Sequence, residues 1–431
     1  MKSLAMTGKD RSTGLVSAII HVMTGNLIGK LLVLVPTVAC IKMLSPKEYA
    51  GLTYAMSVST MVLGFIGPPL NRIYLGLDGD KFKQYAGSIF LGVIGIGGVL
   101  SVVLVLAGIS RDAMLIGAAI LFACNIVRVY AQSYWQRREQ FRLYSQLQIA
   151  ESAAVAICVC TALFLLDSRQ AMTILVCYSL GNLLPYGYTI IRSVREIGVI
   201  QFNETITGLR FFLVDHFSVF LLFALLGLFS QLDILFLKKL GRESDLAAFG
   251  ASLRYYSLGM LVVNAVNSVY LTKLKNNSNE GQILLLRRHI WICLPVAVVF
   301  LVSEPLWGWL VILGSNVEYP NSFETTSILA CSSVFSLLLS PFINIHFSYH
   351  KTARLPRILI IVTLVTLYFR WMLVNEFGGI GAALSLMLGF GLFNFLVALD
   401  AILILKTRLK SAELEKAIDS NLVPGRSLEA I

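Results

Sequence analysis

The chain has 431 residues, of which 57% are hydrophobic and only 14% are charged, and its mean hydropathy is +0.77. Because soluble domains carry about 25% charged residues, this composition excludes an ordinary soluble protein and indicates a membrane protein with many spans. The formal net charge of +11 requires no nucleic acid, because cytoplasmic loops that face anionic lipid have their own reason to be basic.

Apolar runs long enough to cross about 30 Å of hydrocarbon recur along the whole sequence. The first run is too long for the core of a signal peptide and lacks an A-x-A cleavage site, so it is expected to be an uncleaved span. The predicted fold class is therefore all-α integral membrane with about 12 transmembrane helices. They are expected at 15–41, 51–75, 86–108, 113–134, 145–166, 170–191, 211–237, 246–271, 289–313, 324–347, 357–375 and 381–405.

Basic residues gather in alternate connections. The N-terminus, the even-numbered loops and the C-terminus, counted with Arg72 and Arg357 at the edges of the adjoining spans, hold 24 of the 35 Lys and Arg residues, and the odd-numbered loops hold seven. The positive-inside rule then predicts that both termini are cytoplasmic. The polar break "RSVREIGVIQFNETITGLR" predicts a six-helix half at 1–200, a second at 201–405 and a cytoplasmic tail at 406–431. An even number of spans per half suits a parallel repeat.

Lys30 lies near the middle of the first predicted span, in "TGNLIGKLLVL". It is about 18–20 Å from either end of the span, which is beyond the reach of a snorkelling side chain. A charge at the bilayer centre costs roughly 2.5–3.5 kcal/mol on insertion scales. We therefore expect Lys30 to face a water-filled cavity or to pair with an internal acid. Gly25 and Gly29 beside it would let another helix approach closely.

Two arginines also lie deep within predicted spans. Arg128 lies on the polar face of the fourth predicted span and Arg254 on that of the eighth. Polar residues on these spans and on the first and sixth are expected to support them: Asn26, Asn125, Asn264 and Asn182. A further arginine, Arg370, lies near its helix end beside Trp371 and is expected to be interfacial.

Acidic residues in the spans are fewer. Asp215, Glu151 and Asp400 are expected near the cytoplasmic side, where basic loops can pair with them. Asp233 and Glu304 lie deeper on the outer side, and either could neutralise an arginine or carry a proton. The excess of deep bases over deep acids predicts a cationic, water-lined cavity between two halves, suited to an anionic substrate whose phosphate oxygens match arginine.

Other chemistry finds little support in the sequence. All seven cysteines fall within predicted spans and the five histidines lack metal spacing, so neither a disulfide framework nor a metal site is expected. There is no GxxxxGK[ST] motif and no plausible catalytic triad. Paired prolines at Pro68 and Pro69, inside the second span, predict a broken helix of the kind that often marks a hinge.

Four stretches in chain order carry a family resemblance: "IKMLSPKEYAGLTYAMS", "SQLDILFLKKLGRESDLAAFGAS", "SEPLWGWLVILGSNVEYPNSFETTSILA" and "NEFGGIGAALS". Together they resemble segments of polysaccharide flippases of the Wzx type, in the multidrug/oligosaccharidyl-lipid/polysaccharide exporter superfamily. The sequence departs from that pattern at Lys42, where arginine is common, and at Ala50, which precedes the expected Gly51.

The resemblance implies a V-shaped pair of six-helix lobes with alternating access. The implied cargo is an undecaprenyl-diphosphate-linked oligosaccharide repeat, such as O-antigen, turned across the bacterial inner membrane. Lys30, Arg128 and Arg254 would hold the diphosphate. The resemblance further implies a transporter rather than an enzyme, without a cofactor, as a monomeric unit coupled to H+ or Na+. A polysaccharide polymerase and a chain-length regulator are possible partners.

Two alternatives remain open. A cation-coupled multidrug exporter would resemble this layout but would place acids in the early helices, where this chain has Lys30 and no acid. A membrane polysaccharide polymerase would be expected to have a large outer loop with catalytic arginines. The longest outer loop here, near 314–324, contains neither Lys nor Arg.

Overall fold

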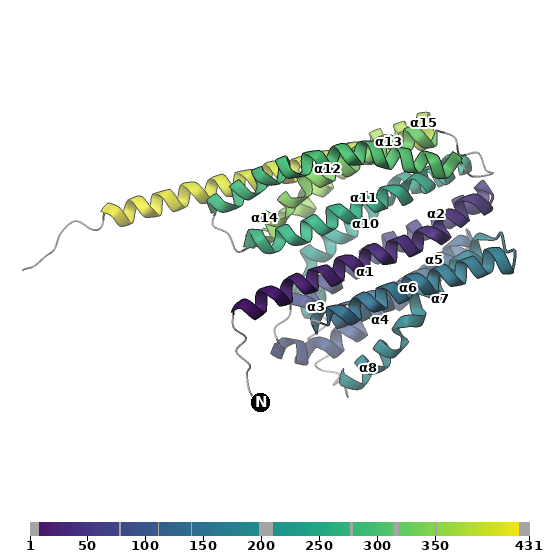
Figure 1. Ribbon diagram of the computed structural model, residues 1–431, viewed down its shortest axis with the longest axis horizontal. Helices are drawn as coiled ribbons and strands as arrows, with labels where there is room; N and C mark the ends of the chain where they lie inside the picture. The colour runs from purple at the N-terminus through teal and green to yellow at the C-terminus, as the bar shows by residue number, and fades with distance from the viewer. Residues whose placement is uncertain are drawn as a thin grey trace, which may run out of the picture.

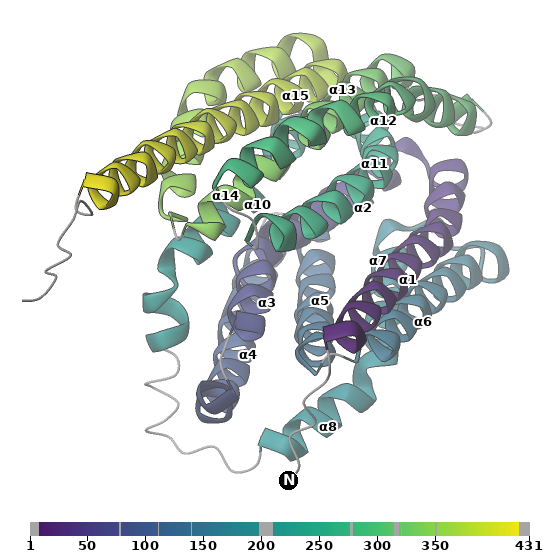
Figure 2. The same cartoon turned by 60° about the vertical axis from the view of Figure 1, so that its left-hand side comes forward.

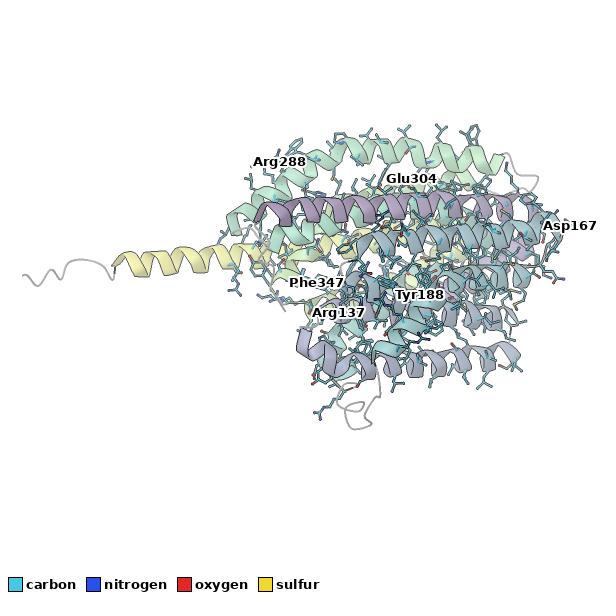
Figure 3. All side chains as sticks on the ribbon, turned by 60° about the horizontal axis from the view of Figure 1, so that its bottom comes forward. Arg137, Asp167, Tyr188, Arg288, Glu304 and Phe347 are labelled. Carbon is cyan, nitrogen blue, oxygen red and sulfur yellow. The ribbon has the colours of Figure 1, made fainter. Side chains whose placement is uncertain are left out.

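The computed structural model describes residues 8–76, 79–110, 112–138, 140–197, 210–275, 279–313, 319, 321–349 and 351–421. Throughout these residues the regular structure is helical, and long helices lie side by side between two ends of the molecule (Figure 1). We call the end where α1 (Gly8–Met43) begins and α15 (Arg354–Asn421) ends the terminal side. The opposite end, which carries Asp167 (Figure 3), is the loop side.

The first half of the chain packs as one group of helices. After α1 it contains α2 (Pro46–Gly64), α3 (Gly67–Gly76), α4 (Gly79–Ser110), α5 (Met114–Arg137), α6 (Phe141–Cys160), η1 (Thr161–Leu165), α7 (Ala171–Leu183), η2 (Leu184–Tyr186) and α8 (Gly187–Ile197). Helix α6 packs against α1 and α7, and α5 packs against α2, α4 and α7. Figure 2 shows α1, α6 and α7 lying together.

The second half of the chain forms another group. It contains η3 (Phe211–Asp215), α10 (Phe217–Lys239), α11 (Glu243–Lys275), α12 (Asn279–Leu313), α13 (Ser322–Leu339), η4 (Ser340–Phe342), α14 (Ile343–Ser348) and α15. Helix α13 packs against α11, α12 and α15, and α15 also packs against α10. The boundary predicted near residue 200 lies outside the described residues, and the predicted tail continues α15 as far as Asn421.

The all-α membrane fold expected from the sequence is confirmed. Ten helical stretches of the described residues are long and apolar enough to cross a membrane. The longest, Arg354–Leu409, changes direction at Gly378 (φ 56°, ψ −124°) and covers two predicted spans. The remaining predicted span, 246–271, lies within α11. Most helices extend beyond the apolar segments predicted as spans. Hydropathy marks the part of a helix that lies in lipid, whereas the backbone hydrogen bonds of the helix continue further.

Local chemistry explains the ends of the second span. Pro46 stands in the first turn of α2, where its missing N–H costs nothing, and the Ser45 hydroxyl accepts a hydrogen bond from the Glu48 N–H at 3.3 Å. The helix ends at Gly64, and α3 starts again at Gly67, directly before Pro68 and Pro69. The proline break predicted from the sequence is thus observed.

The two groups meet mainly where α2 packs against α10 and α11. Near the middle, Gly64 faces Gly227 so closely that a Cβ built on Gly64 would lie 3.1 Å from the Gly227 Cα. On the loop side, the Tyr319 hydroxyl donates to the Ile41 carbonyl at 2.9 Å. Toward the terminal side, the Arg72 guanidinium lies 4.2 Å from the centre of the Phe347 ring (Figure 3).

Candidate functional site

Three basic residues from different helices come together inside the bundle. Lys30 on α1 lies within electrostatic reach of both Arg128 on α5 and Arg254 on α11. We call these three residues the basic cluster. Two of its members belong to the first half of the chain and one to the second, so the cluster spans the junction between the two groups of helices.

Lys30 owes its position to close packing of α1 on α6. A Cβ built on Gly25 would lie 2.7 Å from the Ser145 Cβ, and one built on Gly29 would lie 2.9 Å from the Ser152 Oγ. The close approach expected at these two glycines is therefore observed. The Lys30 side chain is exposed and, among the described residues, has no ion-pair partner.

Arg128 pairs with an acid that the sequence analysis assigned elsewhere. The Arg128 Nη1 donates to the Glu151 Oε1 at 3.0 Å, and these side chains are 28% and 10% exposed. The expectation that Glu151 pairs with a basic loop was wrong. Glu151 lies ten residues into α6 and faces α5 deep in the bundle, because packing of two helices and not closeness along the chain selects its partner.

Neutral donors hold the other oxygen of Glu151. The Tyr186 hydroxyl donates to Glu151 Oε2 at 2.6 Å and Gln132 Nε2 donates to the same oxygen at 3.3 Å. Gln132 Nε2 also donates to the Tyr186 hydroxyl at 2.9 Å. By contrast, the Nε of Arg128 is buried without a hydrogen-bond partner. The carboxylate is thus better satisfied than the guanidinium.

Arg254 reaches across the junction from the second half. Its Nη2 lies 2.7 Å from the Met56 Sδ on α2, a weak acceptor, and the side chain is partly exposed. No carboxylate pairs with it among the described residues. Three cations and the one carboxylate of Glu151 therefore leave two positive charges of the cluster uncompensated.

The predicted supporting amides have different surroundings. Asn182 Nδ2 donates to Asn125 Oδ1 at 3.2 Å, and Asn125 Nδ2 lies 3.5 Å from Ser59 Oγ, so two predicted polar faces meet. Asn26 is partly buried one turn from Lys30. The Asn264 side chain lies outside the part of the chain that the structure describes.

Arg370 is not interfacial, so that expectation was wrong. Its side chain and that of Asp233 are each only 1% exposed, and Arg370 Nη1 donates to Asp233 Oδ2 at 2.8 Å and to the Phe229 carbonyl at 3.0 Å. Ser385 donates to the other oxygen of Asp233. Trp371 suggested a membrane interface, but the helix turns Arg370 toward α10. Of the two roles open to Asp233, it has the first: it neutralises an arginine.

Glu304 lies apart from these bases. It is 8% exposed on α12 and packs between α11 and α13 (Figure 3). Its Oε2 accepts a hydrogen bond from Ser333 Oγ at 3.1 Å, whereas its Oε1 is buried without a partner. Among the described residues no base pairs with it. This carboxylate therefore has neither a counterion nor full hydrogen bonding.

The remaining acids lie away from the cluster. Asp400 accepts a hydrogen bond from Arg354 at 2.8 Å, as expected for an acid beside a basic loop, and Asp215 is exposed. Within the described residues, no group of three or more His, Cys, Asp or Glu side chains is placed to hold a metal ion.

No protein-family model and no curated protein matches the sequence. Solved structures do match the fold. An inward-facing multidrug resistance MATE family transporter of the MOP superfamily matches with a TM-score of 0.64 at 14% identity, over 88% of this chain and 96% of the other. The lipid II flippase MurJ, in an inward closed conformation, matches with a TM-score of 0.62 at 15% identity, over 91% and 93%.

A MOP superfamily transporter from Pyrococcus furiosus, described by the reverse polarity of its binding pocket, matches with a TM-score of 0.62 at 14% identity, over 93% of this chain and 96% of the other. Identities this low carry information about the fold alone. That fold is common to the matched MATE and MurJ structures and agrees with the superfamily that the sequence motifs resemble. The chain is a multi-pass membrane protein with the fold of MOP superfamily transporters.

Proposed function

We propose that this chain is a flippase that carries an undecaprenyl-diphosphate-linked oligosaccharide, the repeat unit of a surface polysaccharide such as O-antigen, across the bacterial inner membrane. The observation that carries the proposal is the basic cluster. Inside an apolar bundle, Lys30 lies within electrostatic reach of Arg128 and of Arg254, and these three bases come from both halves of the chain. Charges in a membrane are expensive and are kept for function.

The charge of the cluster matches that of the proposed cargo. A diphosphate that joins a lipid to a sugar carries two negative charges at neutral pH. The cluster has two positive charges beyond the one that Glu151 balances. Complementary charge attracts the ligand and gives specificity. A cationic drug would meet repulsion at the same place.

The neighbouring surface suits a lipid tail. Leu27, Leu31 and Val35 are 58%, 54% and 57% exposed and recur at helical spacing along α1, beside Lys30. An isoprenoid chain can therefore stay in the bilayer along α1 while its diphosphate contacts the cluster. The sugars would lie toward the polar residues Asn125 and Asn182.

We propose Glu304 as the acid that couples transport to a proton gradient. Asp233 is the weaker candidate because Arg370 already neutralises it. Glu304 has no basic partner among the described residues and one oxygen without a hydrogen bond, so the protonated form suits its buried site. Movement between the two sides of the membrane would let this carboxyl gain and lose a proton.

Depletion of the protein in its host tests the function. Polyprenyl-diphosphate-linked oligosaccharides are quantified by mass spectrometry, and a membrane-impermeant glycan-modifying reagent on intact spheroplasts reports their leaflet. Single repeat units should accumulate where the reagent cannot reach them. Accumulation on the reagent-accessible face would indicate a polymerase instead. An unchanged pool would reject a glycan-lipid cargo and favour the multidrug exporter.

Lys30→Ala tests the cluster directly. Loss of one of the uncompensated charges should reduce lipid-linked oligosaccharide transport at least about tenfold, because a desolvated charge contact contributes on the order of 1.5–3 kcal/mol. Lys42→Ala is the matched control, since Lys42 is exposed at the end of the same helix. Full transport by Lys30→Ala at low expression would remove this residue from the site.

A further inference from the structure

We propose that Glu151 is an exchangeable counterion, which occupies Arg128 in the empty transporter and yields it to a phosphate group of the cargo. The inference rests on the proposed function and concerns the same basic cluster. It assigns a role to a carboxylate that the sequence analysis placed elsewhere, and to the two neutral side chains that hold it, Tyr186 and Gln132.

The first argument is the unequal bonding of the two partners. Arg128 has one bond to Glu151, through Nη1, and its Nε is buried without an acceptor. A buried donor without a partner destabilises the site. A phosphate group offers more acceptor oxygens than one carboxylate oxygen and matches the fork of a guanidinium. In the empty site, therefore, the Nε of Arg128 lacks a hydrogen-bond acceptor, and a phosphate oxygen can supply one.

The second argument is the state of Glu151 after Arg128 has left. Its Oε2 already accepts hydrogen bonds from Tyr186 at 2.6 Å and from Gln132 at 3.3 Å, and neither donor is charged. Lys30 also remains within electrostatic reach of this carboxylate. Removing one member of a buried ion pair is costly when the remaining charge stays buried without a partner. Here both charges keep partners, so the exchange is inexpensive.

The third argument is accessibility. The Arg128 side chain is 28% exposed and Lys30 is exposed, so a ligand can reach the cluster without unfolding the helices around it. Competition by Glu151 would weaken binding of the cargo and speed its release. A transporter benefits from this, because binding that is too tight slows the return to the empty state.

The test measures binding of inorganic pyrophosphate to the purified full-length protein by titration calorimetry. Glu151→Gln removes the competitor and should tighten pyrophosphate binding about tenfold, while it slows transport of the lipid-linked oligosaccharide. Tyr186→Phe removes a donor that stabilises the released carboxylate. It should therefore make Glu151 hold Arg128 more firmly and weaken pyrophosphate binding.

The opposite signs separate this role from a structural one, because variants that only damaged the fold would both weaken binding. Glu376→Gln is the matched control, since Glu376 is exposed on α15 and loses the same charge away from the cluster. It should bind pyrophosphate as the unmodified protein does. Arg128→Ala should cost more affinity in the Glu151→Gln background than alone, since the guanidinium is free there.

The outcomes distinguish the two proposals. If Glu151→Gln binds pyrophosphate no more tightly than the unmodified protein, or if Tyr186→Phe tightens binding, the exchange is wrong and the flippase can still be right. If neither the unmodified protein nor Glu151→Gln binds pyrophosphate, the anion site fails, and the proposed function and the exchange fall together.

Discussion

Among the described residues, each half of the molecule has one arginine–carboxylate pair inside the helix bundle, and the two pairs differ in exposure and in surroundings. Arg370 and Asp233, in the second half, are each 1% exposed; Ser385 and the Phe229 carbonyl add hydrogen bonds, while Nε and Nη2 of Arg370 are buried without a partner. Arg128 and Glu151, in the first half, are 28% and 10% exposed. The Arg370–Asp233 pair is sealed by protein, whereas the Arg128–Glu151 pair adjoins accessible bases.

Under the proposed function, this difference separates structural from functional charge. A sealed pair has no way to exchange partners and can act only on stability, by tying α15 to α10. An accessible pair beside further cations can bind a ligand. Neighbouring bases and exposure therefore say more about function than the presence of an ion pair, which by itself is weak evidence for either role.

The largest expected effect comes from breaking the sealed pair. Asp233→Ala leaves the Arg370 guanidinium buried without a counterion and should lower the free energy of unfolding by about 3–5 kcal/mol. Thermal unfolding of the purified protein in detergent measures this. The double variant Asp233→Leu/Arg370→Met removes both charges and should recover most of the loss. An Asp233→Ala variant as stable as the parent would contradict the structural role.

Breaking the accessible pair should cost less. In Glu151→Gln the amide oxygen can still accept a hydrogen bond from Arg128, and the amide NH2 can donate to the Tyr186 hydroxyl. Solvent also screens the partly exposed guanidinium. We expect a loss of about 1–2 kcal/mol in the same unfolding measurement. If Glu151→Gln destabilised the protein as much as Asp233→Ala, the two pairs would contribute equally to stability and the distinction between a sealed and an accessible pair would be wrong.

The smallest effect on stability is expected at Glu304, because its replacement leaves no buried base without a counterion. Glu304→Gln keeps an acceptor for Ser333 and should change the free energy of unfolding by less than about 1 kcal/mol. Transport, however, should lose its response to a proton gradient, measured with and without an ionophore. Transport that still responded to the gradient would exclude Glu304 as the coupling acid.

Much of the fold could be predicted from the sequence, because a membrane constrains a chain strongly. Twenty apolar residues must form a helix there, and paired prolines must interrupt it. The break before Pro68 and the close approach at Gly25 and Gly29 both follow from such local rules. The ends of the helices do not, since capping and loop contacts decide them.

The partners of the charges could not be predicted from neighbours along a helix. Glu151 is 23 residues from Arg128, and Asp233 is 137 from Arg370. Depth would have been a better guide for the first pair. Arg128 lies nine residues from the end of α5 and Glu151 ten from the start of α6, on the same side of the bundle. Which helices are adjacent, however, is tertiary information.

The contact between Gly64 and Gly227 places almost no side-chain volume between α2 and α10 where they cross. Such a crossing acts as a fulcrum for the two helices. Pro46, at the start of α2, is about 27 Å from Gly64 at 1.5 Å per residue. A tilt of about 10° there would swing that end by about 5 Å. Such a tilt would break the hydrogen bond between the Tyr319 hydroxyl and the Ile41 carbonyl, while the crossing at Gly64 and Gly227 would hardly move.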